Sequence, residues 1–150
     1  MITPQDAFFV SSKEGKSFHV ITDTMTVKVP SERVNGAYSV TEDVTPPGGG
    51  APPHIHHRED EMFYVLEGEF EFRCGDRVFK AAKGALVALP REIPHSLKNT
   101  GNALGKTLLV LIPGGTEKAF EEVSMLTSGP PDLEKINAIT MKYGVEFLQQ

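Results

Sequence analysis

Three histidines and several carboxylates lie within residues 48–68, and side chains of these types can bind a metal ion. The stretch reads GGGAPPHIHHREDEMFYVLEG. Glycine and proline precede the histidines and hydrophobic residues follow them, which favours a strand over a helix. Because side chains two apart on a strand share a face, we expect His54 and His56 to point together and His57 to point away. Two imidazoles on one face, followed by a carboxylate, indicate a site for a divalent cation.

Short strand-like segments separated by turns fill most of residues 17–112. Val, Ile, Thr and aromatic residues dominate these segments, and Gly, Pro and Asn mark the turns between them. After a first pair of strands within 17–30, further strands are expected at 37–44, 62–66, 69–73, 77–81, 85–89, 95–98 and 103–112. This pattern predicts an all-β sandwich or barrel of antiparallel strands.

The pattern changes to helices after this region. Thr116 is expected to cap a helix over 117–125, and Asp132 a second helix over 133–143 that ends at Gly144. No linker divides the chain, so residues 1–150 are expected to form one domain. Its barrel would span about 17–112 and its helical segment about 115–145.

The amino-acid composition limits the kinds of partner that the protein could bind and the cellular compartment that it suits. The net charge is −5, which argues against nucleic acid as a partner because phosphates require a basic face. Cys74 is the single cysteine, so no internal disulfide forms and a reducing compartment is favoured. Residues 1–16 hold no long apolar run, so we expect no signal peptide or membrane anchor there. These features predict a cytoplasmic protein with neither nucleic acid nor membrane as its partner.

Two spaced motifs resemble those of the cupin superfamily. The first contains Gly48, His54-Ile55-His56, Glu61 and Gly68, and the second contains Gly84, Pro90, His95 and Asn99. The resemblance implies a double-stranded β-helix, or jelly-roll barrel, with a metal bound by His54, His56, Glu61 and His95. Three imidazoles and one carboxylate suit a divalent first-row transition metal, which includes Fe, Mn, Ni, Co, Cu and Zn.

Two features of the motifs concern local shape. Glu61 has the opposite strand parity to the histidines, so residues 57–60 are expected to form a solvent-facing bend that turns it toward them. Glu92 occupies a position where cupins usually have glycine. Because glutamate adopts a positive φ only at a cost, the turn into His95 is expected to differ in shape.

A narrower resemblance concerns the chemistry. The strings PPHIHHREDEMFYVLEGEFEF, LPREIPHSLKNTG and KYGVEFL look like single-domain cupins of the quercetin dioxygenase-like group. In that group a divalent metal binds a flavonol, and the ligand glutamate takes the hydroxyl proton of the substrate. The resemblance therefore implies that Glu61 is both a metal ligand and the general base.

Three functions remain open at this point. The first is a dioxygenase acting on a flavonol-like or other enolic or aromatic small molecule. The second is a non-oxidative cupin, such as an isomerase or lyase, and the third is a metal-containing module that binds a small molecule without catalysis. A homodimer is expected in each case, because strands within 17–44 could pair or pack across a two-fold axis.

Other residues have simpler expected roles. His57 and His19 are predicted to be surface or partly exposed strand histidines, and Cys74 an inert thiol. Side chains that share a face with Glu61 or His95 are expected to line the barrel interior. These are Phe63, Val65 and Leu97.

Overall fold

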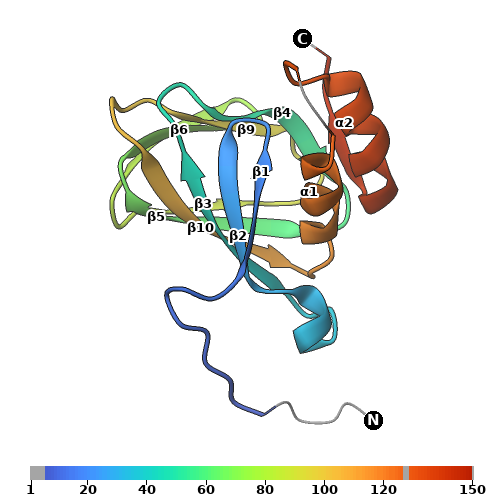
Figure 1. Cartoon of the computed structure of the whole chain (residues 1–150). Helices are drawn as coiled ribbons and strands as arrows, with labels where there is room; N and C mark the ends of the chain where they lie inside the picture. The colour runs from blue at the N-terminus through green and yellow to red at the C-terminus, as the bar shows by residue number, and fades with distance from the viewer. Residues whose placement is uncertain (1–5, 127–128, 150) are drawn as a thin grey trace.

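Two antiparallel β-sheets make up most of the computed structural model, which describes residues 6–126 and 129–149 (Figure 1). The six-stranded sheet contains, in spatial order, β1 (Lys16–Val20), β2 (Asp23–Val29), β3 (Ser39–Thr45), β10 (Gly105–Ile112), β5 (Asp60–Glu67) and β8 (Leu86–Leu89). The five-stranded sheet contains β11 (Val145–Phe147), β4 (Gly50–His56), β9 (His95–Asn99), β6 (Glu69–Cys74) and β7 (Arg77–Ala82). The prediction of an all-β jelly-roll barrel is confirmed.

The core lies between the two sheets and follows the alternation in the sequence. Phe70 and Phe72 of β6 are buried, whereas the glutamates beside them are not. Also buried are the three side chains that were expected to face inward, namely Phe63, Val65 and Leu97. Removing a side chain of this kind from water contributes about 1.5–3 kcal/mol, so these strands hold the two sheets face to face.

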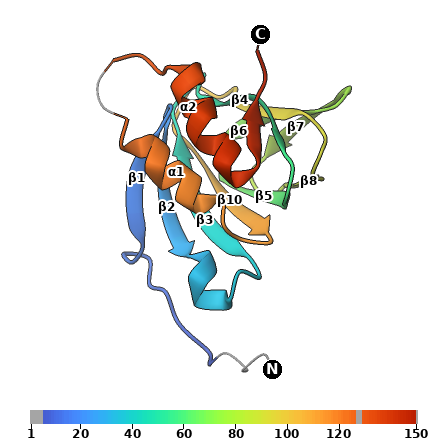
Figure 2. The same cartoon turned by 90° about the vertical axis from the view of Figure 1, so that its right-hand side faces the viewer.

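Two helices cover one side of the sheets, as Figure 2 shows. They are α1 (Glu117–Ser124) and α2 (Leu133–Thr140); short 3₁₀ turns form η1 (Ser31–Val34) and η2 (Met141–Tyr143). Helix α1 contacts β1, and α2 contacts β11. The described part of the chain contains no helix that is long and apolar enough to cross a membrane.

The two predicted helix caps have different outcomes. Asp132 accepts hydrogen bonds from the backbone N–H groups of Glu134 and Lys135, as expected for a cap. Thr116 stands at the predicted N-cap position, but its side chain makes no such bond. The buried Glu117 carboxylate, at the first position of the helix, accepts from two N–H groups outside it, those of Gly115 at 2.8 Å and Ser31 at 2.7 Å. This carboxylate also joins η1 to α1.

Strand β11 was not expected from the sequence. It pairs with β4, so that Val145 lies opposite His56 and Phe147 lies opposite His54. The ring of Phe147 stacks on the ring of His54 at 5.2 Å between centroids. The end of the chain therefore packs against the strand that carries two of the candidate ligands.

The turn before β9 corrects the expectation about Glu92. This residue adopts the left-handed conformation itself, with φ of 69°, so the turn keeps the backbone shape that glycine would allow. Its N–H donates to the carbonyl of His56 at 2.8 Å, and its carboxylate accepts from His57 Nδ1 at 2.8 Å. These bonds hold the turn against the end of β4.

Replacing Glu92 with glycine is expected to stabilise the fold by about 0.5–1 kcal/mol. A non-glycine residue in the left-handed region costs about 1–2 kcal/mol, and the greater freedom of glycine in the unfolded chain offsets part of the relief. Glu92→Ala is the control, because alanine keeps the strain and loses only the exposed contact with His57. Urea unfolding midpoints measure both variants, and a Glu92→Gly protein less stable than Glu92→Ala contradicts the prediction.

Candidate metal centre

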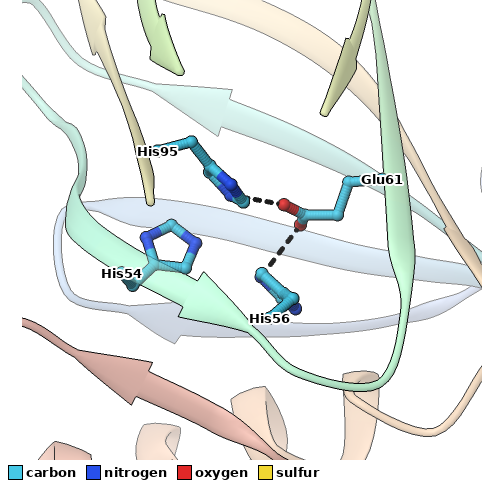
Figure 3. A group of neighbouring side chains, drawn as sticks. All are labelled: His54, His56, Glu61 and His95. Atoms are coloured by element: carbon cyan, nitrogen blue, oxygen red, sulfur yellow. Dashed lines mark ion pairs between the residues drawn. The ribbon is translucent and has the colours of Figure 1, made fainter. Parts of the chain in front are cut away.

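Four buried side chains from three strands converge between the sheets (Figure 3). His54 and His56 come from β4 and His95 from the neighbouring β9, whereas Glu61 comes from β5 of the opposite sheet. One possible ligand atom from each residue lies within 4.8 Å of the others, and no member is more than 5% exposed. The structure thus brings together the four residues that the cupin resemblance implied.

Several polar atoms of this cluster lie close together without forming ordinary hydrogen bonds. Glu61 Oε2 lies 2.5 Å from His95 Nε2, and Glu61 Oε1 lies 3.2 Å from His56 Nε2 (Figure 3, dashed lines). Even so, Glu61 Oε2 and both ring nitrogens of His95 have no hydrogen bond of acceptable geometry among the described residues. Buried polar atoms are rarely left without a partner. Imidazole nitrogens and carboxylate oxygens converging in this way fit a divalent transition metal.

Two of the histidine rings are oriented by an acceptor oxygen at Nδ1. His54 Nδ1 lies 2.8 Å from the carbonyl of Pro52, and His56 Nδ1 lies 2.5 Å from Glu59 Oε1. An acceptor at Nδ1 requires the proton there, which leaves the lone pair of a neutral ring on Nε2. The oriented Nε2 atoms are therefore the ones available to a metal.

Glu59 corrects the expected solvent-facing bend. Its side chain is only 3% exposed and binds His56, although Arg58 beside it is exposed and Asp60 is only partly buried. Carboxylates that accept from the second nitrogen of a ligand histidine are common around protein metals. The sequence signal for this contact is that Glu59 lies three positions after His56. The run of charged residues around Glu59 obscured that signal.

Burial and charge give His54 and Glu61 the protonation states that metal binding requires. Burial lowers the pKa of His54 to about 3, and the neighbouring imidazoles of His95 and His56 add to that shift, so the ring is neutral at pH 7. Burial by itself would raise the pKa of Glu61, but the imidazoles of His56 and His95 outweigh it and lower the pKa to about 2. A neutral imidazole and an ionised carboxylate are the forms that bind a metal.

The other singled-out residues lie apart from this cluster. His57 lies at the surface between Glu92 and Glu146, with ring nitrogens 2.8 and 2.9 Å from their carboxylates. His19 contacts Thr24 on the neighbouring strand. Burial raises the pKa of the Cys74 thiol, which agrees with the expected lack of reactivity.

A cavity of about 60 Å³ borders the cluster. His54 and Glu61 line it, together with apolar side chains that include Phe63 and Leu97. Helices α1 and α2 contribute Val123 and Ile136 among the remaining walls. Two carboxyl groups that the sequence analysis did not single out also line the cavity, namely Asp23 and Asp43.

The structure is a jelly-roll barrel with three histidines and a glutamate between its sheets, which is the arrangement that the cupin resemblance implied. Residues 42–112 match the family described as "Cupin domain". The crystal structure of a predicted oxalate decarboxylase from Thermotoga maritima superimposes with a TM-score of 0.65 at 24% identity. The superposition covers 71% of this chain and 99% of that one. The superposition therefore shows that the two proteins share a fold.

Two plant proteins are among the curated relatives that match most of this chain. Nectarin-1 of Nicotiana langsdorffii x Nicotiana sanderae is 28% identical over 145 residues, which cover 87% of this chain and 59% of that protein. Germin-like protein subfamily 2 member 2 of Arabidopsis thaliana is 33% identical over 119 residues, covering 71% of this chain and 53% of that protein. The chain thus spans less than two thirds of either relative.

Proposed function

We propose that this protein is a metal-dependent enzyme that acts on a small molecule, with dioxygenation of an enolic or aromatic substrate as its reaction. The observation that carries this proposal is that the histidine and glutamate cluster borders a cavity through His54 and Glu61. A site that serves structure alone has its metal enclosed by protein ligands, whereas a catalytic site keeps room for a substrate. The net charge of −5 also supports a small molecule over nucleic acid.

Each side chain has a distinct part in this reaction. A divalent metal, when bound by His54, His56, Glu61 and His95, would polarise an oxygen of the substrate. Glu61 would accept the hydroxyl proton of the substrate. Its low pKa makes it a weak base, which suits an acidic enol or phenol better than an alcohol. The apolar walls, including Phe63 and Leu97, would exclude water from the reacting molecule.

The cavity volume bears on the size of the substrate. Pockets for drug-sized ligands measure about 300–1,000 Å³, well above the roughly 60 Å³ found beside the cluster. A flavonol would require the walls from α1 and α2 to move. Among the enolic and aromatic substrates that the quercetinase-like resemblance implies, the volume therefore favours one smaller than a flavonol.

Oxygen consumption tests the proposal. Protein loaded in turn with Fe, Mn, Co, Ni, Cu and Zn is mixed with a panel of small enols, polyphenols and flavonoids, and oxygen uptake is recorded. Glu61→Gln is expected to lower the rate by at least about 100-fold, since general base catalysis contributes about 10²–10⁴-fold. Glu71→Gln, outside the cluster, is the matched control. Absence of uptake with every metal and substrate counts against a dioxygenase.

A non-oxidative reaction is the second candidate, and one observation favours it. Asp43 and Glu61 both line the cavity, and a pair of carboxyl groups can serve as acid and base in an isomerase or lyase. Product formed without oxygen consumption would support this reaction. Ligand binding without any turnover would instead support a metal-containing binding module.

We also propose that the protein is a homodimer. Strand β1 ends the six-stranded sheet, and its first residues are exposed, so this edge is available for pairing with a second copy. Light scattering is expected to give about twice the chain mass of 16.4 kDa. A single species at the monomer mass would refute the dimer.

A cytoplasmic location remains a proposal. The lone Cys74 supports it, because a chain that forms no internal disulfide suits a reducing compartment. Fractionation of the native cells, with immunodetection of the protein, tests this location. Recovery from the secreted fraction would contradict it.

A further inference from the structure

Asp43 of β3 has a buried carboxyl group that no structural role explains. The residue is 5% exposed, and its Oδ1 has no hydrogen-bond partner among the described residues. The neighbouring Asp23 differs, because Thr22 donates to its Oδ1 and Thr45 donates to its Oδ2, each at 2.8 Å. Burying a polar group without a partner costs about 1–3 kcal/mol in proteins. A group that destabilises the fold in this way is a candidate for function.

The position of Asp43 connects it with the metal centre. It lies on the inward face of β3, opposite Met25 of β2 and Thr107 of β10. Its side chain lines the same cavity as His54 and Glu61. A molecule held at the cluster and filling this cavity therefore meets Asp43 as well.

Burial and the neighbouring negative charges favour the protonated form of this carboxyl group. Burial raises the pKa of Asp43 well above its usual range, and the negative charges of Asp23, Glu61 and Glu42 raise it further. A protonated carboxyl can donate a hydrogen bond. Among the described residues that line the cavity there is no Lys or Arg, so an anionic ligand finds no cationic side chain there.

We propose that Asp43 is a substrate-binding residue that donates a hydrogen bond to a small, uncharged hydroxy-carbonyl compound in this cavity. One oxygen of that compound would lie at the metal cluster and the other at Asp43. Hydroxy-carbonyl compounds enolise, which agrees with the enolic substrate proposed above. The assignment rests on the proposed metal-dependent function and adds a substrate class and a further contact to it.

Two small probes test this assignment on the full chain loaded with Co²⁺. Hydroxyacetone is an uncharged hydroxy ketone, and glycolate is an anion with the same number of non-hydrogen atoms. Each is titrated while the visible spectrum of the bound cobalt is followed. Hydroxyacetone is expected to bind more tightly than glycolate. Asp43→Val is expected to weaken hydroxyacetone binding about 2–10-fold, the usual effect of one hydrogen bond, whereas Asp43→Asn retains it because the amide still donates.

A neighbouring position supplies the matched control. Thr41 lies on the same face of β3, and its buried hydroxyl also lacks a partner among the described residues, but it does not line the cavity. Thr41→Val should therefore bind hydroxyacetone like the unmodified protein. Circular dichroism shows whether each variant folds, and Asp43→Asn is the nearly isosteric second variant.

Failure of the metal centre, of the Asp43 contact and of the substrate class would each give a different result. Cobalt content, measured first, tests the metal centre: a protein that binds no Co²⁺ refutes the proposed function and this assignment together. If Co²⁺ binds but Asp43→Val keeps the affinity of the unmodified protein for hydroxyacetone, only the role of Asp43 is overturned. Tighter binding of glycolate than of hydroxyacetone overturns the substrate class.

Discussion

Replacing His95 with alanine is expected to weaken metal binding by more than about 100-fold. His95 is one of four converging side chains, and neither of its ring nitrogens has a hydrogen-bond partner among the described residues. Its loss removes a ligand, which costs more than the 10–100-fold typical for losing a residue behind a ligand. Competition with a chromophoric chelator measures the affinity, and elemental analysis after dialysis measures the content.

Thermal unfolding gives an independent measure of the same effect. Metal that binds only the folded state raises the unfolding temperature, so added metal should stabilise the unmodified protein and leave His95→Ala almost unchanged. His19→Ala is the control, since His19 contacts Thr24 and lies outside the cluster. Equal stabilisation of His95→Ala and His19→Ala would show that His95 is not a ligand.

Replacing Glu59 is expected to weaken metal binding about 10–100-fold, although Glu59 is not among the four converging residues. Its carboxylate lies 2.5 Å from His56 Nδ1 and orients the ring toward Glu61. Glu59→Ala removes both the charge and the acceptor, whereas Glu59→Gln keeps an acceptor oxygen. The affinity should therefore fall in the order unmodified protein, Glu59→Gln, Glu59→Ala.

Asp60→Asn separates this effect from a general loss of negative charge. Asp60 is adjacent in sequence but pairs with Arg91 at the surface, where an ion pair contributes at most about 1 kcal/mol. Its substitution should leave metal affinity unchanged. If Glu59→Ala and Asp60→Asn behave alike in chelator competition, the carboxylate of Glu59 does not support His56.

Local patterns account for the parts of the fold that could be predicted. The alternation around Phe70 and Phe72 determines which face of β6 is buried, and turn residues separate the strands, so the all-β class followed from the sequence. The N-terminal cap at Asp132 is equally local. Strand β11 escaped prediction because three residues form a strand only when β4 is there to pair with them. The bond that the Glu117 carboxylate accepts from Ser31 likewise depends on η1, which is remote in sequence.

By itself, the sequence determined which residue types form the candidate site and which side chains share a face of one strand. Spacing alone places His54 and His56 on one side of β4, because alternation is a property of any extended chain. Only the tertiary structure decided that Glu61 reaches them from the opposite sheet, that Glu59 turns inward, and that Asp43 lines the same cavity. These relations depend on how the two sheets face each other, and strand periodicity carries no information about distances between sheets.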